Sequence, residues 1–371
     1  RLSMNNKKSV GVITYYNYNY GAILQAYALQ RKMEELGYDC ELINYDYRRD
    51  RTLLGIPWRN IKNPIRFCAS VLKRIVLFNR VRKKHAVMTK SVHNNLKFSK
   101  QYYKSSKQIK KSPPQYDIYL TGSDQVWNPN ISAPGFQTRL LDFVDTTKGK
   151  KVSYASSIGI KELPKSKKDF VKKYLSNFNA ISVREEEAKN ILVEFIDKDI
   201  QRNIDPTLLG NKEDWLKFGR PISEIKEPYI FVYMLANQPE LVKYANDLSN
   251  KFNLKILSVG YGVSFQNKIL NNKYLSPEEF VWAIANADYI VSNSFHGTCF
   301  SVIFKKKARI YIPPTVQCRI VELLEGCNLS RLLNDKIIED SELEMLYNDA
   351  DDYLAKERKC ANDYLIGLKD L

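Results

Sequence analysis

The 371-residue sequence lacks the features of a secreted, membrane-spanning or zinc-binding protein. No apolar run reaches the ~18 residues that a membrane-spanning helix needs, and the first residues, RLSMNNKK, lack the apolar core of a signal peptide. The six cysteines form no CxxC pair, which argues against a metal site or a disulfide framework and favours a reducing compartment. We therefore expect a cytoplasmic protein without a bound metal.

Two nucleotide-binding signatures are also missing, and histidine is scarce. No G-x-G-x-x-G follows the first predicted strand and no G-x-x-x-x-G-K-[ST] is present, so neither a dinucleotide fingerprint nor a P-loop is expected. Of the three histidines, His85 and His93 lie in a basic run, and His296 lies in the stretch VSNSFHGTCFSVIF. A lone histidine between a strand-like run and a glycine is a candidate for chemistry.

Acidic residues are absent from one segment, residues 51–116, which contains 17 of the 58 Lys and Arg. Without it, 41 basic residues balance the 41 acidic ones, so the formal net charge of +17 belongs to one surface. The segment is predicted to form a helix with one apolar face, made of Ile65, Cys68, Leu72, Ile75 and Val76. Such a basic helix can lie on an anionic membrane; the alternative is a solvated cap over a sheet edge. Aromatic residues are few in this segment and the chain shows no recognised nucleic-acid-binding module, so no nucleic-acid partner is expected.

Strands and helices are predicted to alternate along the rest of the chain. Residues 9–14 form a strand, a helix with apolar residues at spacings of four and three follows, and residues 40–45 form the next strand. Such β-α-β units favour a parallel sheet. We predict an α/β protein of two doubly wound, Rossmann-like domains. They cover residues 4–207, with a basic helical insertion at about 51–116, and residues 208–371, whose C-terminal helix packs back on the first domain.

Each unusual motif follows a predicted strand. These motifs are YYNYNYG after the first strand, then GSDQVW, SSIG, Arg184 and SFHG. Because ligands bind at the carboxyl ends of the strands in doubly wound sheets, we expect one composite site between the two domains.

Two residues are candidates for acid–base chemistry. His296 precedes a helix predicted over residues 298–304, where amide groups and the positive dipole end favour an anion, and histidine can act there as a general acid or base. The alternative is a histidine that only hydrogen-bonds a loop. Asp124 either caps the turn that leads into QVWNP or offers a carboxylate to the cleft.

Two arginines are candidates for binding an anion. Arg184 ends a buried strand, and its fork of donors suits a carboxylate or phosphate; the alternative is an ion pair with one of the three following glutamates. Arg319 lies near the start of a second predicted helix, and its alternative is a solvated surface residue. Gly21 and Gly122 would let the backbone approach a ligand closely.

These stretches together resemble the polysaccharide pyruvyl transferase family, from about residue 10 to residue 333. The resemblance is carried by NYNYGAILQAYALQRKMEELGY, YDIYLTGSDQVWNP, VSYASSIG, AISVREEEA, NIDPTLL and LSPEEFVWAIANADYIVSNSFHGTCFSVIF. It implies a fold similar to the GT-B glycosyltransferases. It also implies a reaction in which pyruvate moves from phosphoenolpyruvate to two hydroxyls of a sugar, giving a cyclic ketal and phosphate, with no cofactor beyond phosphoenolpyruvate as co-substrate.

The resemblance also implies roles for individual residues. His296 and Asp124 would be catalytic. The donor would be bound by Arg184, Ser294, Gly297, Thr298 and Arg319. The acceptor would be bound by Asn17, Asn19, Gly21, Ser123 and Gln125. Many members carry an arginine at the position of Ser294, so this chain must hold the donor differently, with Arg319 as a candidate.

The resemblance further implies an acceptor in capsule or exopolysaccharide synthesis, on a lipid-linked precursor. The basic segment at residues 51–116 would then dock on the inner face of the plasma membrane. The alternative function is a GT-B-like glycosyltransferase that uses a nucleotide sugar, although no clear acidic ribose-binding motif is present in the second half.

Overall fold

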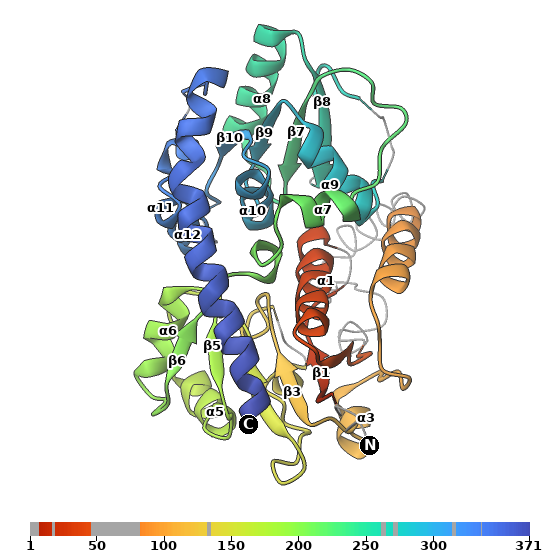
Figure 1. The fold of residues 1–371 in the computed structure, drawn as a ribbon, viewed down its shortest axis with the longest axis vertical. Coiled ribbons are helices and arrows are strands. Elements are labelled where there is room, and N and C mark those ends of the chain that lie inside the picture. The colour runs from red at the N-terminus through yellow and green to blue at the C-terminus, as the bar shows by residue number, and fades with distance from the viewer. Residues whose placement is uncertain are drawn as a thin grey trace, which may run out of the picture.

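Two parallel four-stranded sheets, each flanked by helices, lie one above the other in the computed structural model (Figure 1). The structure describes residues 7–16, 19–45, 82–131, 135–260, 265–269, 274–313, 317–334 and 336–371. The predicted α/β class with parallel sheets is therefore confirmed.

The first sheet has the strand order β2-β1-β3-β4. Its strands are β1 (Ser9–Ile13), β2 (Asp39–Leu42), β3 (Ile118–Thr121) and β4 (Lys150–Ser153). Two isolated bridges continue it from β4 to β5 (Ile181–Val183), which pairs in parallel with β6 (Ile200–Arg202). Strand β3 is buried along its whole length, as expected for a parallel strand that is covered on both faces.

The second sheet has the order β10-β9-β7-β8. Its strands are β7 (Tyr229–Met234), β8 (Lys255–Gly260), β9 (Tyr289–Ser292) and β10 (Lys307–Ile310). All six residues of β7 are buried, again as a central parallel strand requires.

Helices connect the strands in both halves. The longer ones are α1 (Tyr20–Glu35), α5 (Lys165–Leu175), α6 (Glu186–Val193), α8 (Pro239–Phe252), α9 (Pro277–Asn286), α10 (Phe295–Ile303), α11 (Gln317–Gly326) and α12 (Asp340–Gly367). The shorter ones are α3 (Ser106–Lys111), α4 (Phe136–Arg139), α7 (Lys212–Phe218), η2 (Pro206–Leu208), η3 (Ser330–Leu333) and η4 (Leu368–Asp370).

Local capping explains where α10 begins. The sequence predicts that this helix starts at residue 298, after Gly297, but it starts three residues earlier. Ser294 is its N-cap: its Oγ accepts from the amide of Gly297 (3.4 Å), and its carbonyl accepts from Thr298 Oγ1 (3.0 Å). His296 therefore lies within the first turn of the helix.

The long helix α12 runs along both sheets (Figure 1). Tyr347 Oη donates to the carbonyl of Lys306 in the second half (2.7 Å), and Tyr364 Oη donates to the carbonyl of Ser153 on β4 (2.7 Å). One hydrophobic cluster contains residues of both sheets, α1, α10 and α12. The domain boundaries at residues 207 and 208 stay a prediction.

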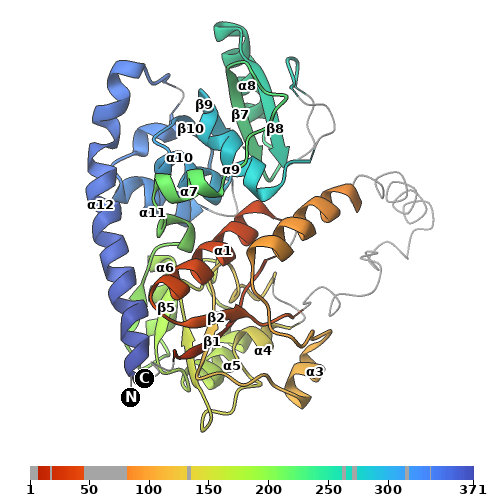
Figure 2. The same cartoon turned by 45° about the vertical axis from the view of Figure 1, so that its right-hand side comes forward.

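Part of the basic segment lies outside the described residues, including its predicted apolar face from Ile65 to Val76. A described helix at residues 82–95 lies alongside α1 and below α9 (Figure 2). Ser91 Oγ (2.9 Å) and Asn95 Nδ2 (2.7 Å) donate to Oε1 of Glu278 in the first turn of α9. Among the described residues, no helix is both long enough and apolar enough to cross a membrane.

Candidate active site

A cavity of about 370 Å³ lies beyond the carboxyl ends of the central strands of both sheets. Each sheet has a switch point, where the order in which successive strands are added to the sheet reverses. It lies between β1 and β3 in the first sheet and between β7 and β9 in the second. Residues of the segments that follow these four strands line the cavity: Tyr15, Asn19, Asp124, Gln125, Leu235, Ala236, Asn293, Ser294, Phe295 and His296. Ligands bind at such switch points in open α/β sheets. A larger cavity, of about 920 Å³, lies between β6 and α12 and contains none of the predicted site residues.

His296 joins the two halves at this cavity. It is 8% exposed, and its Nε2 lies 3.5 Å from Oδ2 of Asp205. The other side of the imidazole faces the first turn of α1, because a Cβ atom placed on Gly21 would lie 2.0 Å from Nδ1. The first turns of α1 and α10 therefore meet at this ring.

Asp205, directly before η2, is the carboxylate that faces His296. Its Oδ1 accepts from the amide (3.0 Å) and the hydroxyl (2.7 Å) of Thr207, and its Oδ2 accepts from Nη1 of Arg184 (2.7 Å). Burial alone would raise the pKa of Asp205, but His296, Arg184 and the Thr207 hydrogen bonds lower the pKa below its ordinary value. An ionised carboxylate here can orient the imidazole.

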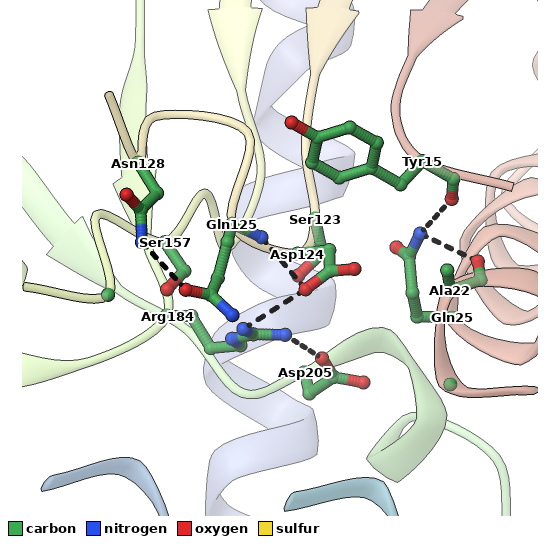
Figure 3. A network of polar contacts seen from close by, with 12 residues as sticks. Tyr15, Ala22, Gln25, Ser123, Asp124, Gln125, Asn128, Ser157, Arg184 and Asp205 are labelled. Carbon is green, nitrogen blue, oxygen red and sulfur yellow. Dashed lines mark hydrogen bonds and ion pairs between the residues drawn. The ribbon is translucent and has the colours of Figure 1, made fainter. Parts of the chain in front are cut away.

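Arg184 is surrounded by carboxylates (Figure 3). Besides Asp205, its Nη2 lies 3.5 Å from Oδ1 of Asp124, and its Nε lies 3.8 Å from Oε2 of Glu185. Burial would lower the pKa of Arg184, but the three carboxylates raise it above its ordinary value. Its side chain is 1% exposed, and its closest ionic partner is Asp205 at 2.7 Å, whereas the predicted glutamate partner Glu185 lies 3.8 Å away. Direct contact with a donor stays a prediction.

Asp124 combines the two roles that the sequence leaves open. Its φ of 67° places it in the left-handed region, and its Oδ1 accepts from the amide of Gln125 (2.8 Å), which stabilises the turn. The side chain, 18% exposed, also lines the cavity. Figure 3 shows one oxygen of this carboxylate joined both to the backbone amide of Gln125 and to Arg184.

Arg319 on α11 also lines the cavity and is only 5% exposed, so the alternative of a solvated surface residue is wrong. Its Cζ lies 5.5 Å from the centre of the Phe295 ring, and Cζ of Arg184 lies 4.9 Å from the same ring. The ring thus packs against both guanidinium groups, which favours cations at this position.

The family of the chain follows from a comparison with family models. The model described as polysaccharide pyruvyl transferase matches residues 19–311. The chain belongs to the polysaccharide pyruvyl transferase family. It is therefore a transferase, as the sequence predicts.

Comparison with solved structures shows which known fold the chain resembles. No curated protein matches the sequence significantly. The S. aureus MnaA–UDP co-structure is similar with a TM-score of 0.51 and 9% identity, over 97% of this chain and 95% of that chain. UDP-GlcNAc 2-epimerase from Neisseria meningitidis bound to UDP-GlcNAc has a TM-score of 0.48 and 10% identity, over 95% and 93%. At this identity the first similarity shows the fold alone, and it confirms the predicted GT-B-like fold class.

The other predicted donor and acceptor residues of the transferase differ in their access to the cavity. Asn19 lines it as the N-cap of α1, with Oδ1 accepting from the amide of Gly21 (2.9 Å) and from Tyr233 Oη (3.2 Å). Ser123 is buried and donates to the carbonyl of Ala155 (2.7 Å), so its hydroxyl is engaged by the backbone. Asn17 lies outside the described residues.

Gly297 and Thr298, predicted to bind the donor of the transferase, are buried within α10. A Cβ on Gly297 would lie 2.2 Å from Oγ of Ser292, so close packing against Ser292 is the reason for a glycine at this position. Gln125 lines the cavity, and its Oε1 accepts from Asn128 Nδ2 (2.9 Å). The assigned roles of these residues stay predictions.

Sequence reasoning missed Asp205, Phe295 and Tyr15 as site residues of this transferase. Asp205 follows β6 in the motif NIDP, so the rule that ligands lie at strand ends would have selected it had β6 been predicted. Phe295 and Tyr15 give no such signal, because an aromatic residue beside a strand is usually part of the core.

Proposed function

We propose that this transferase moves pyruvate from phosphoenolpyruvate onto two hydroxyls of a hexose, giving a cyclic ketal and phosphate. The observation that supports this most is His296 beside the buried Asp205 at the wall of a cavity that the switch points of both sheets share. The reaction requires a group that gives and takes protons and that lies where an anionic donor can bind. His296 meets both conditions, because its imidazole lines the cavity and belongs to the first turn of α10.

In the proposed reaction, each proton is given or taken by a named group. His296, as imidazolium beside Asp205, protonates the methylene carbon of the enol, and a sugar hydroxyl attacks the central carbon while Asp124 takes the hydroxyl proton. Loss of phosphate gives an oxocarbenium ion, and the second hydroxyl closes the ring. The phosphate, still in the site, takes the second hydroxyl proton and leaves as hydrogen phosphate, and the proton on Asp124 returns to His296 through solvent. We expect no metal or further cofactor.

The donor needs positive charge near its carboxylate and phosphate. Because Arg184 already faces three carboxylates, we assign this task to Arg319 and to the first turn of α10, both of which line the cavity. The positive dipole end of a helix and its amide groups favour anions. This arrangement would replace the arginine that many members carry at the position of Ser294.

The acceptor is proposed to be a hexose of a lipid-linked capsular or exopolysaccharide precursor. Of the predicted acceptor residues, Asn19 and Gln125 line the cavity. The basic segment would bring the enzyme to the inner face of the plasma membrane. Arg82, Lys83 and Lys90 are exposed on the described helix at residues 82–95, and each cation near an anionic surface contributes ~1 kcal/mol.

The activity is tested by phosphate release from phosphoenolpyruvate with a panel of aryl hexosides. His296→Asn should lower turnover by ~10²–10⁴-fold while the variant melts cooperatively and still binds the donor. His93→Asn, an exposed residue of the basic segment, serves as the control. Full turnover by a folded His296→Asn variant would remove the proposed proton carrier. Turnover of a nucleoside-diphosphate sugar with no phosphate release would instead support the alternative glycosyltransferase.

Membrane docking is tested separately with anionic vesicles. Reversal of Arg82, Lys83 and Lys90 to Glu should weaken co-sedimentation, most clearly at low salt, where charges are screened least. The matched control reverses Lys165, Lys172 and Lys173, which are exposed on α5. Equal loss of vesicle binding in both triple variants, or no loss in either, would contradict docking through this segment.

A further inference from the structure

Helix α6 of the first half is capped by a residue of the second half. Its own N-cap residue, Glu185, gives no side-chain cap, because Oε1 of Glu185 accepts from Ser157 Oγ (2.8 Å) and from the amide of Ile158 (3.0 Å). Oε2 of Glu322 on α11 accepts from the amide of Glu186 instead, at 3.1 Å. A carboxylate at a helix N-terminus is favourable, so this contact holds α11 to α6.

Arg202, at the end of β6, strengthens the same junction. Its Nε lies 3.6 Å from Oε1 of Glu322 on α11, and its Nη2 donates to Oε2 of Glu357 on α12 at 2.6 Å. The side chains of Arg202, Glu322 and Glu357 are 19%, 28% and 11% exposed. Such partly buried pairs are screened less by solvent than surface pairs.

The junction lies next to the cavity of the active site. Arg319, which lines that cavity, precedes Glu322 by three residues on α11, so the two side chains share one face of the helix. Both side chains line a small space of about 20 Å³, together with Arg184, Arg202 and Asp205. It is large enough for one water molecule.

We propose that Glu322 is a positioning residue of the transferase: by fixing α11 to α6 and Arg202, it keeps Arg319 at the wall of the active-site cavity. The proposal rests on the proposed function in assigning the donor to Arg319. Other contacts join the two halves elsewhere, such as Tyr20 Oη with the carbonyl of Leu275 (2.8 Å). Loss of Glu322 should therefore shift α11 without separating the halves.

Kinetics give the first test, with Glu322→Ala, Glu322→Gln and the control Glu325→Gln, which changes the same charge at an exposed position of α11. Glu322→Ala should raise KM for phosphoenolpyruvate by about tenfold, the effect of one charge-assisted hydrogen bond, with a smaller change in kcat. Glu322→Gln should be affected less, because its amide oxygen can still accept from Glu186. An unchanged KM in Glu322→Ala, with a lowered melting temperature, would reduce Glu322 to a structural role.

A second test does not depend on turnover, so a failure of the proposed function would not hide the result. Phenylglyoxal modifies accessible arginines, and peptide mapping by mass spectrometry gives the rate at Arg319. This residue is 5% exposed and should react slowly in the parent protein and in Glu325→Gln, but severalfold faster in Glu322→Ala. Equal rates at Arg319 in all three proteins would overturn the proposal.

Discussion

Gly21→Ala places a methyl group against the imidazole of His296. The new Cβ would lie 2.0 Å from Nδ1, 2.5 Å from Cγ and 2.6 Å from Cε1 of that ring. Since non-bonded heavy atoms pack at roughly 3.5 Å, the ring or the first turn of α1 must move by about 1.5 Å.

The size of that movement sets the expected effects. It disturbs the 3.5 Å approach of Nε2 to Asp205, and a misplacement of ~1 Å in an active site lowers turnover by ~10²-fold. Stability should change less. Alanine is a better helix former than glycine by up to ~1 kcal/mol, while overpacking costs ~1–3 kcal/mol, so the net loss should stay below about 2 kcal/mol.

Turnover and thermal melting of Gly21→Ala and its control variants test the contact between Gly21 and His296. Gly367→Ala is the matched control, because it lies at the end of α12 and its Cβ would meet no atom within 4 Å; both its turnover and its melting temperature should equal or exceed those of the parent. In a His296→Ala background, Gly21→Ala should no longer destabilise the protein. A Gly21→Ala variant with the parent's turnover and melting temperature would refute the contact between α1 and His296.

Three further substitutions test the charges of the structure. Asp205→Asn should lower the free energy of unfolding by ~3 kcal/mol, since it breaks a buried ion pair with Arg184. Because the pKa of Asp205 is held below its ordinary value, urea titrations should show this loss above about pH 4 and a shrinking difference in more acidic buffer. Arg184→Lys should destabilise by ~1–2 kcal/mol in the same assay, because one ammonium group cannot reach both Asp205 and Asp124; parent-like stability would contradict this. Burial lowers the pKa of Lys306 to about 8 from 10.5, so between these values the unfolded chain alone binds the proton and stability rises with pH. Lys306→Met should remove that rise, and an identical pH profile would disprove the shift.

The sheets could be predicted because their strands are short, apolar runs in a regular alternation. Residues 9–14 are predicted to form a strand, and β1 covers Ser9–Ile13. The site followed from the topology: motifs that follow strands meet at the switch points. This reasoning placed Asp124 and His296 at one cavity although 172 positions separate them in the sequence.

Other features depend on packing between distant segments and have no local signal. The sequence places Gly297 directly before a predicted helix, yet it lies inside α10 because Ser294 caps the helix. Glu185 could not be assigned to the turn at Ser157 from the sequence, since the contact joins two loops. The burial of Arg319 likewise depends on which face of α11 packs against Phe295.

The contacts that build the site cross from one half to the other. His296 meets Asp205 and Gly21, Phe295 packs on Arg184, and Glu322 caps α6. The first half contributes the carboxylates, and the second half contributes the histidine and the cation that line the cavity. Under the proposed function, the relative placement of the two sheets is part of the catalytic apparatus, because a shift at any one of these contacts changes the distance between His296 and Asp205. Substitutions along this boundary should thus lower turnover before they lower the melting temperature, whereas substitutions within either sheet should do the reverse.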